Sequence, residues 1–446
     1  MIALKNQHQT LSWRQSTVIG SMLFGLFFGA GNLIFPVQMG QEAGANLWPA
    51  ALGFVVTAVG LPLLSVVAIG VSGSKGLNDM SERVLPKYGH IFTALLYFVL
   101  GPLLSIPRTA TVSYEIGFSQ FTQHPLLLFA YSIFFFICVA YFSLKPSGIM
   151  TWVGKWMNPV FLIFLALILA GVLLTGDSFS FTAFPVAPKY QEAPFLQGFL
   201  NGYNTMDVIA GLIFGILVVR SIHQVGVTED RDVAMGTIKS GALSMGLMAV
   251  IYFLLTMLGA RSLEDIGLAQ NGGEALIQIV STKFGVFAGI LLFVVMFVAC
   301  LKTAIGLIVS CAETFAEIYP NVLDQEKWTY VFIGISFVIA NAGLNAILAW
   351  AVPFLAFMYP LSIVIALLHL VPAWTKRPVI MRWTLGFTLV PACFDLQHAL
   401  PTGSIPALDH FATAVFPFYS YGFAWVLPAI LGLFIGLVHS YVIRKD

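Results

Sequence analysis

Long apolar stretches separated by short polar segments recur along almost the whole chain. A bilayer core about 30 Å thick needs roughly 20 apolar residues per helix. About twelve stretches reach that length, so the pattern predicts an all-α integral membrane protein with about twelve transmembrane helices. Their centres lie near Phe28, Leu61, Leu104, Phe134, Leu162, Phe214, Ile251, Val298, Ile335, Phe357, Thr388 and Leu431.

The charged residues agree with this pattern, because they are few and lie mostly between the apolar stretches. Only 9% of the residues are charged, whereas a soluble domain carries about 25%. If the N-terminus is cytoplasmic, nearly all Lys and Arg residues fall on the cytoplasmic side, as the positive-inside rule requires. The exceptions are Lys189, Arg261 and Lys283 outside, and Arg108 and Lys302 within spans. The bias predicts that both termini are cytoplasmic.

Two of the predicted spans, the first and the sixth, are interrupted near mid-membrane. Residues 25–36 contain three glycines, Asn32 and Pro36, and Gly and Pro cost a helix about 1 and 3 kcal/mol per position. Residues 201–207 place polar side chains where a continuous helix would be most apolar. Close helix packing explains the glycines alone, but it does not explain Asn32, Pro36 or a matching break in the sixth span.

The distance between the two breaks indicates an inverted repeat. They are five helices apart, so the second unit enters the membrane from the opposite side, and matching broken helices form the binding site of such transporters. We therefore predict one transmembrane domain over residues 1–446, with a five-plus-five inverted repeat and broken helices one and six. The repeats cover about 15–175 and 195–372, and two additional C-terminal helices cover about 379–443.

The breaks also predict a chemistry. The N-terminus of a half-helix presents unpaired N–H groups that suit a carboxylate. The C-termini of half-helices and unwound carbonyl groups present oxygens that suit an ammonium group or Na⁺. A pair of broken helices can therefore hold a zwitterion and a cation together.

Ionisable residues inside spans are costly and point to partners or to an aqueous path. Arg108 and Glu115 are seven residues apart and share a helix face, which favours an ion pair between them. Asp207 opens the second half of helix six, either as an N-cap or as part of a substrate or cation site. Lys302 interrupts an apolar run and lies too deep to reach the membrane surface by snorkelling.

Four motifs, in order along the whole chain, resemble the signature of the branched-chain amino acid:cation symporter family. They are Phe28–Pro36, Pro107–Ser113, Gly202–Asp207 and Ala299–Ala304. The resemblance implies import of leucine, isoleucine and valine across the bacterial cell membrane with Na⁺ or H⁺, by a secondary active symporter. It also implies the fold of the bacterial leucine transporter and no enzyme activity.

The resemblance further implies a substrate site at the two breaks. The backbone amides of Ala30 and Gly31 would bind the substrate carboxylate, and Asn32 would be a polar ligand beside it. The unwound stretch of helix six would complete the pocket and could receive the ammonium group. Its members are Tyr203, Asn204, Thr205 and Asp207.

A cation site follows from the same resemblance. The sodium site most widely shared by this fold would use carbonyl groups of Gly25 and Phe28, with Ala299, Lys302 and Thr303 from helix eight. Lys302 replaces an expected hydroxyl ligand, and an ammonium group is a donor with no acceptor. Our hypothesis is that Lys302 takes the place of Na⁺ and couples transport to H⁺. The rival is that Lys302 pairs with Asp207 or Glu313 and a different sodium site remains.

Other classes of function fit less well. The chain contains no nucleotide-binding, zinc-protease or serine-hydrolase motif, and no repeated filter of the kind that channels use. An amino-acid sensor or an uncoupled exchanger on the same fold stays open. No cofactor beyond the coupling Na⁺ or H⁺ is predicted. The predicted partners are the substrates, that cation and the lipid bilayer, with no nucleic acid and no obligate protein.

Overall fold

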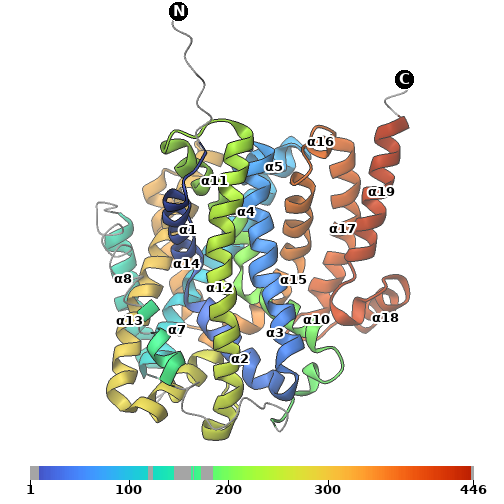
Figure 1. Ribbon diagram of the computed structural model, residues 1–446. Helices are drawn as coiled ribbons and strands as arrows, with labels where there is room; N and C mark the ends of the chain where they lie inside the picture. Colours follow the sequence, from blue (N-terminus) through green and yellow to red (C-terminus); the bar gives the residue numbers. More distant parts are fainter. Residues whose placement is uncertain (1–9, 119–123, 145–161, 164, 172–183, 443–446) are drawn as a thin grey trace, which may run out of the picture.

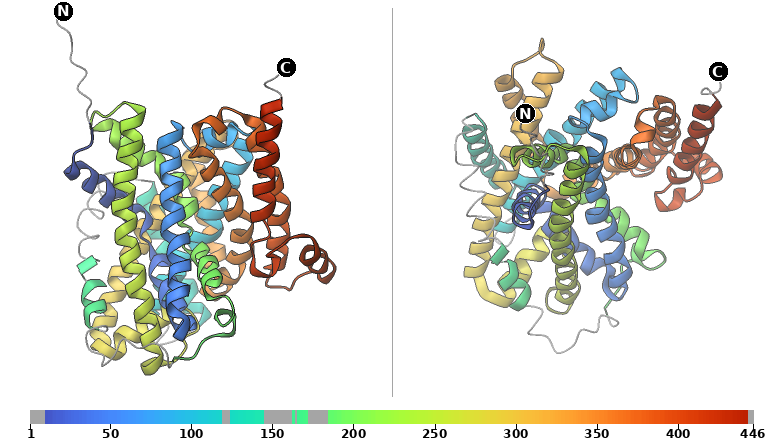
Figure 2. Two further views of the ribbon diagram at one scale, coloured as in Figure 1. Left: turned by 45° about the vertical axis from the view of Figure 1, so that its right-hand side comes forward. Right: turned by 45° about the horizontal axis from the view of Figure 1, so that its top comes forward.

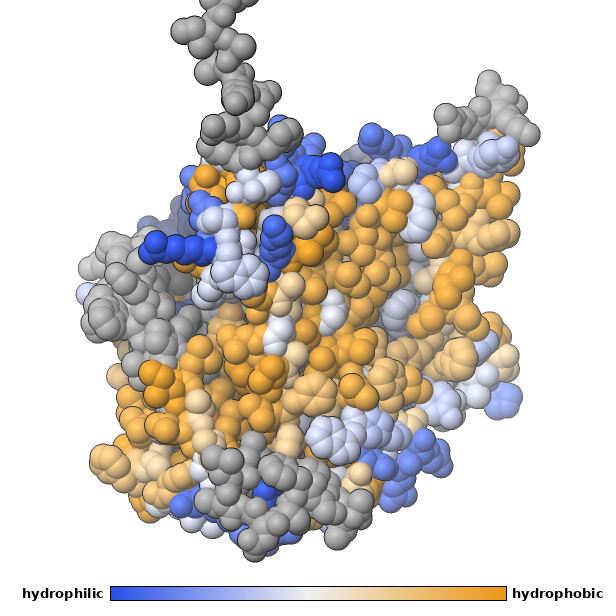
Figure 3. Space-filling model, viewed as in Figure 1, coloured by the Kyte–Doolittle hydropathy of each residue, from blue (hydrophilic) through white to orange (hydrophobic). Residues whose placement is uncertain are grey.

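In the computed structural model, which describes residues 10–118, 124–144, 162–163, 165–171 and 184–442, every regular element is a helix. The long helices stand side by side as a bundle, and α1 begins at the same side of the bundle at which α19 ends (Figure 1). Apolar residues form a broad band across the middle of the face in Figure 3, with polar residues above and below it. This is the surface expected of a bundle that spans a bilayer.

The predicted spans one to four each consist of one or more helical segments. These are α1 (Trp13–Phe27) with α2 (Ala30–Ala43); α3 (Leu47–Val55) with the π-helical η2 (Val56–Gly60) and α4 (Leu61–Ser72); α6 (Pro86–Phe98) with the π-helical η3 (Val99–Ser105) and α7 (Ile106–Phe118); and α8 (Pro125–Ser143). The short α5 (Leu77–Glu82) follows α4. Of the fifth span, residues 162–163 and 165–171 are helical, and the rest lies outside the described residues.

The second half of the chain is also made of helices. They are α10 (Pro194–Asn201), η5 (Gly202–Thr205) and α11 (Asp207–Gln224); α12 (Asp230–Ile266); α13 (Gly272–Ile318); α14 (Gln325–Ala340); α15 (Leu344–His369) with α16 (Pro372–Thr375); α17 (Pro378–His398); α18 (Pro406–Val415); and α19 (Val426–Val442). A bend at Gly285, where φ is +79°, divides α13. The span centred near Val298 is the part after that bend.

The described helices confirm the predicted fold class. Eight continuous helical runs in the described part of the chain are long and apolar enough to cross a membrane, and α19 is a shorter apolar helix. The first predicted span is broken between Phe27 and Ala30, and the sixth between Asn201 and Asp207. The boundaries proposed for the two repeats and the C-terminal pair stay a prediction.

Glycines let α2 and α12 cross closely beside the first break. A Cβ atom added to Gly40 on α2 would lie 2.0 Å from the carbonyl oxygen of Thr256, and one added to Gly259 on α12 would lie 2.0 Å from that of Val37. Both positions exclude a side chain, because the two backbones touch there. The crossing packs the half-helix after the first break directly against α12.

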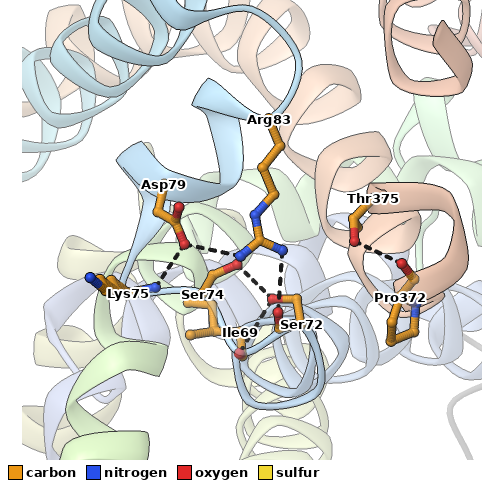
Figure 4. A network of polar contacts seen from close by, with 8 residues as sticks. All are labelled: Ile69, Ser72, Ser74, Lys75, Asp79, Arg83, Pro372 and Thr375. Atoms are coloured by element: carbon orange, nitrogen blue, oxygen red, sulfur yellow. Dashed lines mark hydrogen bonds and ion pairs between the residues drawn. The ribbon is translucent and has the colours of Figure 1, made fainter. Parts of the chain in front are cut away.

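The last two long helices form a lateral extension of the bundle. α17 and α19 pack against each other and α17 packs against α15, so the pair stands at one side in both views of Figure 2. A polar network near the end of α4 ties α5 to the end of α4 (Figure 4). Arg83 donates to the carbonyl oxygen of Ser72 (3.2 Å) and to Asp79 (3.1 Å). Arg382 of α17 donates to the carbonyl oxygen of Val84 (2.9 Å).

The connection between α17 and α19 is organised around one carboxylate. Asp409 of α18 accepts hydrogen bonds from the hydroxyl groups of Ser404 and Tyr419 and contacts His398 at 3.2 Å. These contacts, with the Ser404 bond as the largest cause, hold the pKa of Asp409 below its usual value. The charged form of Asp409 therefore stabilises the turn around α18.

Candidate functional site

The two breaks bring the starts of two half-helices together. At the first break, Gly29 is extended, and its amide donates to the side-chain oxygen of Asn32 at 2.9 Å. At the second, Met206 adopts a left-handed conformation (φ +62°) immediately before α11 begins at Asp207. The side chain of Asn32 contacts that of Asp207, so α2 and α11 start beside each other although 175 residues separate the two side chains.

A buried cluster of polar side chains joins the breaks. The amide nitrogen of Asn32 donates to both carboxylate oxygens of Asp207, at 3.1 and 2.9 Å, and also contacts the hydroxyl of Tyr252. Tyr252, on α12, donates to the same carboxylate at 2.9 Å. Asp207 is 1% exposed, Asn32 2% and Tyr252 0%. Since burying a carboxylate is costly unless its oxygens are hydrogen-bonded, Asn32 and Tyr252 stabilise the charge.

This geometry excludes one of the two roles predicted for Asp207, that of an N-cap. The N-cap of α11 is Met206, and no side-chain hydrogen bond closes that cap. Asp207 occupies the first helical position, and its carboxylate is bound by Asn32 and Tyr252 instead. The N-cap interpretation is therefore wrong. Tyr252 was missed from the sequence, although a tyrosine in the apolar run of α12 is a signal that could have found it.

Arg108 of α7 lies against both breaks. Its Nη1 donates to the carbonyl oxygen of Asn204 at 2.7 Å, and its guanidinium carbon lies 5.0 Å from the centre of the Phe35 ring. A Cβ atom added to Gly31 would lie 2.8 Å from Nη2. The predicted ion pair with Glu115 is wrong: within the described part of the chain the hydrogen bond of Arg108 goes to the unwound stretch of helix six.

The residues of the candidate cation site also lie close together. Lys302 of α13 donates from Nζ to the carbonyl oxygen of Gly25 at 3.2 Å. Thr303 donates to the carbonyl oxygen of Ala299 at 3.0 Å, and a Cβ atom on Gly29 would lie 3.6 Å from the Thr303 hydroxyl. The end of α1, the first break and the middle of α13 thus meet, with the Lys302 ammonium group on a carbonyl oxygen of α1.

A cavity of about 1190 Å³ opens from the breaks. Eight of the predicted site residues line it: Gly25, Ala30, Gly31, Asn32, Thr205, Asp207, Lys302 and Thr303. The other four have partners of their own. Tyr203 stacks on Tyr359 of α15 with ring centres 4.0 Å apart, Phe28 stacks on Phe24, and the carbonyl groups of Asn204 and Ala299 accept the hydrogen bonds described above.

The cavity extends from the breaks toward one side of the molecule. Its lining continues along α1 to Thr17, along α11 to Leu217 and along α13 to Glu313. Thr17 lies near the start of α1, and Leu217 and Glu313 lie in the second halves of α11 and α13. α1 begins at the side of the bundle at which α19 ends (Figure 1). The path from that side to the buried polar cluster therefore runs between α1, α11, α12 and α13.

These features define a multi-pass membrane protein with two broken helices, and known structures share this fold. Mhp1, described as a nucleobase-cation-symport-1 family transporter in a closed conformation with bromovinylhydantoin bound, has a TM-score of 0.60 at 14% identity and covers 99% of this chain and 96% of its own. An inward-facing conformation of Mhp1 has a TM-score of 0.62 at 12% identity, with 99% and 94% covered. At such low identity the likeness shows the fold alone.

The chain belongs to the family described as branched-chain amino acid transport protein, which matches residues 12–443. The branched-chain amino acid permease BrnQ of Lactobacillus delbrueckii subsp. lactis is 42% identical, over 98% of this chain and 99% of the relative. The permease BraB of Bacillus subtilis is 38% identical, over 96% of both. These relatives are named as permeases, which confirms that the protein is a transporter and not an enzyme.

Proposed function

We propose that the protein imports leucine, isoleucine and valine through the cavity between its broken helices, driven by a cation gradient. Membership of the family and the permease names of the relatives support the substrate class. The main support for the proposal is that both breaks meet at a buried polar cluster at the inner end of the cavity. Half-helix N-termini suit the carboxylate of an amino acid, and the largely apolar cavity suits an aliphatic side chain.

The coupling ion that we propose is H⁺, carried through Lys302. Its ammonium group donates to the carbonyl oxygen of Gly25, one of the oxygens that a sodium ion would use in this fold. An ammonium group at that position supplies the positive charge that Na⁺ would otherwise supply. Because a lysine can lose its proton when its surroundings are apolar, the site can alternate between charged and neutral forms as transport proceeds.

The mechanism that we propose is alternating access in the bacterial cell membrane, with the cavity open to the cytoplasm and both termini on that side. The stacked rings of Tyr203 and Tyr359 lie at the second break, where the chain enters it from α10. The chain leaves this break through α11. Opening toward the other side of the membrane would separate these rings, while α1 and α13 close the cavity near Thr17 and Glu313.

The test is uptake of labelled leucine by purified protein in liposomes. One set of vesicles has an inward Na⁺ gradient at equal pH, and the other has an inward H⁺ gradient without Na⁺. Accumulation driven by H⁺ alone is the expected result. Accumulation driven by Na⁺ would support the transporter and reject the role of Lys302. If folded protein neither accumulated nor exchanged leucine under either gradient, the substrate class would be rejected.

The coupling role has its own control. Lys302→Thr restores the hydroxyl group that the fold's sodium site expects, and it should abolish H⁺-driven accumulation. Lys327→Met removes an exposed lysine from the start of α14 and should leave accumulation unchanged. Sodium-stimulated uptake that is equal in the wild type and in Lys302→Thr would contradict the coupling role. Exchange of leucine without net accumulation under any gradient would favour the uncoupled exchanger.

A further inference from the structure

We propose that Arg108 binds the carboxylate of the transported amino acid, beside the N-terminus of α2. The inference rests on the proposed function and adds a specificity-determining residue to its site. It differs from the sequence expectation, in which the amides of Ala30 and Gly31 alone hold the carboxylate and Arg108 pairs with Glu115.

The position of the guanidinium group is the first support. Arg108 is 6% exposed and lines the same cavity as Ala30, Gly31 and Asp207. Its Nη2 lies so close to Gly31 that a Cβ atom there would be 2.8 Å away. An anion at the start of α2 would therefore meet the helix amides and the guanidinium together, because no side chain separates them.

The hydrogen-bonding capacity of Arg108 is the second support. A guanidinium group carries five N–H donors and stays protonated in proteins. In the described part of the chain, one acceptor binds it, the carbonyl oxygen of Asn204. Donors therefore remain for a ligand in the cavity, and a carboxylate is the group that matches them best, since it can accept two parallel hydrogen bonds from one guanidinium.

The charges around the cavity give the substrate an orientation. Asp207 lines the same cavity, and its oxygens already accept two hydrogen bonds from Asn32 and one from Tyr252. A carboxylate has about four lone-pair sites, so Asp207 can still accept from the ammonium group of an amino acid. Arg108 and Asp207 then bind opposite ends of one zwitterion. The aliphatic side chain is left to the apolar lining, which includes Leu100 and Phe214.

The competing explanation is that Arg108 only tethers the unwound stretch of helix six through Asn204. Such a tether would matter equally for every ligand, whereas a carboxylate-binding arginine matters only for ligands that carry a carboxylate. Leucinamide and leucinol keep the ammonium group and the side chain of leucine but lack its carboxylate. The conjugate base of 4-methylpentanoic acid keeps the carboxylate and lacks the ammonium group.

The experiment measures binding of these four ligands to purified protein by ligand-dependent thermal stabilisation. In Arg108→Gln, the affinity for leucine and 4-methylpentanoate should fall by about tenfold or more, the value of one to two charge-assisted hydrogen bonds. The affinities for leucinamide and leucinol should change by less than about twofold. Arg108→Lys keeps the charge without the planar fork and should restore part of the leucine affinity.

Two further variants keep the test decisive. Arg382→Gln removes an arginine that also donates to a backbone carbonyl between helices but lies outside the cavity of the breaks, and all four affinities should stay unchanged. Gly31→Ala keeps Arg108 but places a methyl group against its Nη2. It should weaken leucine more than leucinamide, and it replaces Arg108→Gln if that variant does not fold.

Equal weakening of leucine and leucinamide binding in Arg108→Gln would overturn the inference in favour of the tether. Unchanged leucine affinity would overturn the inference as well, without supporting the tether. If the wild type bound none of the four ligands, the proposed function itself would fail. The two failures are therefore distinguishable.

Discussion

The hydrogen bonds between Asn32 and Asp207 join the two broken spans, so Asn32→Ala is a direct perturbation of the site. The substitution removes the amide that donates to both oxygens of Asp207. It also removes the oxygen that accepts from the amide of Gly29.

The expected loss of stability follows from the contacts. One amide shared between two carboxylate oxygens counts as a single hydrogen bond to a charged group, worth about 1.5–3 kcal/mol, and the bond that caps Gly29 adds about 1 kcal/mol. Asn32→Ala should therefore lower the free energy of unfolding by about 2.5–4 kcal/mol. In an Asp207→Asn background the first contribution falls to that of a neutral hydrogen bond, and the loss should shrink by about 1–2 kcal/mol.

A double-mutant cycle measures this difference. The free energies of unfolding of the wild type, Asn32→Ala, Asp207→Asn and the double variant are compared in detergent by denaturant titration. Asn341→Ala is the matched control, because Asn341 donates to the carbonyl oxygen of Phe337 at a turn remote from Asp207. Its effect should be the same in both backgrounds within about 0.5 kcal/mol.

A coupling of less than about 0.5 kcal/mol between Asn32→Ala and Asp207→Asn would refute the reasoning. It would mean that the charge of Asp207 does not depend on the amide of Asn32, and that the breaks are held together by other contacts.

Two other predictions concern packing and pH. Gly40→Ala should force α2 and α12 apart and destabilise the protein by about 1–3 kcal/mol. Gly334→Ala is the control and should be neutral or slightly stabilising, because no atom lies within 4 Å of its added Cβ. Equal effects of the two substitutions on thermal unfolding would contradict the close crossing. Asp409→Asn should increase hydrogen exchange around α18 at pH 7, because the lowered pKa of Asp409 means that its ionised form stabilises the turn. That stabilisation is present above the unfolded pKa of about 3.9 and is lost as the pH falls through the lower folded pKa. The difference between variant and wild type should therefore stay constant from pH 7 to about pH 4 and shrink as the pH falls further. A difference that did not shrink below about pH 4 would exclude this role.

The breaks could be predicted from sequence because their cause is local. Glycines, a proline and an asparagine in residues 25–36 disfavour a continuous helix, whichever residues pack against them. The apolar stretches likewise predict the helices, because lipid allows little other than a helix in a chain of this composition. Both inferences depend on residues that are adjacent in the chain.

The contacts of the site depend on tertiary structure, and sequence spacing alone gave a wrong partner for Arg108. Seven residues of helix advance about 10 Å along the axis at 1.5 Å per residue. At that separation an acceptor that lies nearer to Arg108 binds its guanidinium group in place of Glu115. The unwound carbonyl of Asn204 supplies such an acceptor at 2.7 Å. Tyr252 could not be assigned to Asp207 for the same reason, since α12 reaches the breaks only through its packing on α2.

The central claim is that leucine occupies the cavity between the broken helices. Its most direct test is protection of a single cysteine at Ala210, which lines that cavity on α11, in a variant whose four native cysteines have been replaced and whose leucine uptake is retained. We expect saturating leucine to slow modification of this cysteine by a water-soluble thiol reagent several-fold, and lysine to have no effect. A rate that leucine leaves unchanged would contradict the claim.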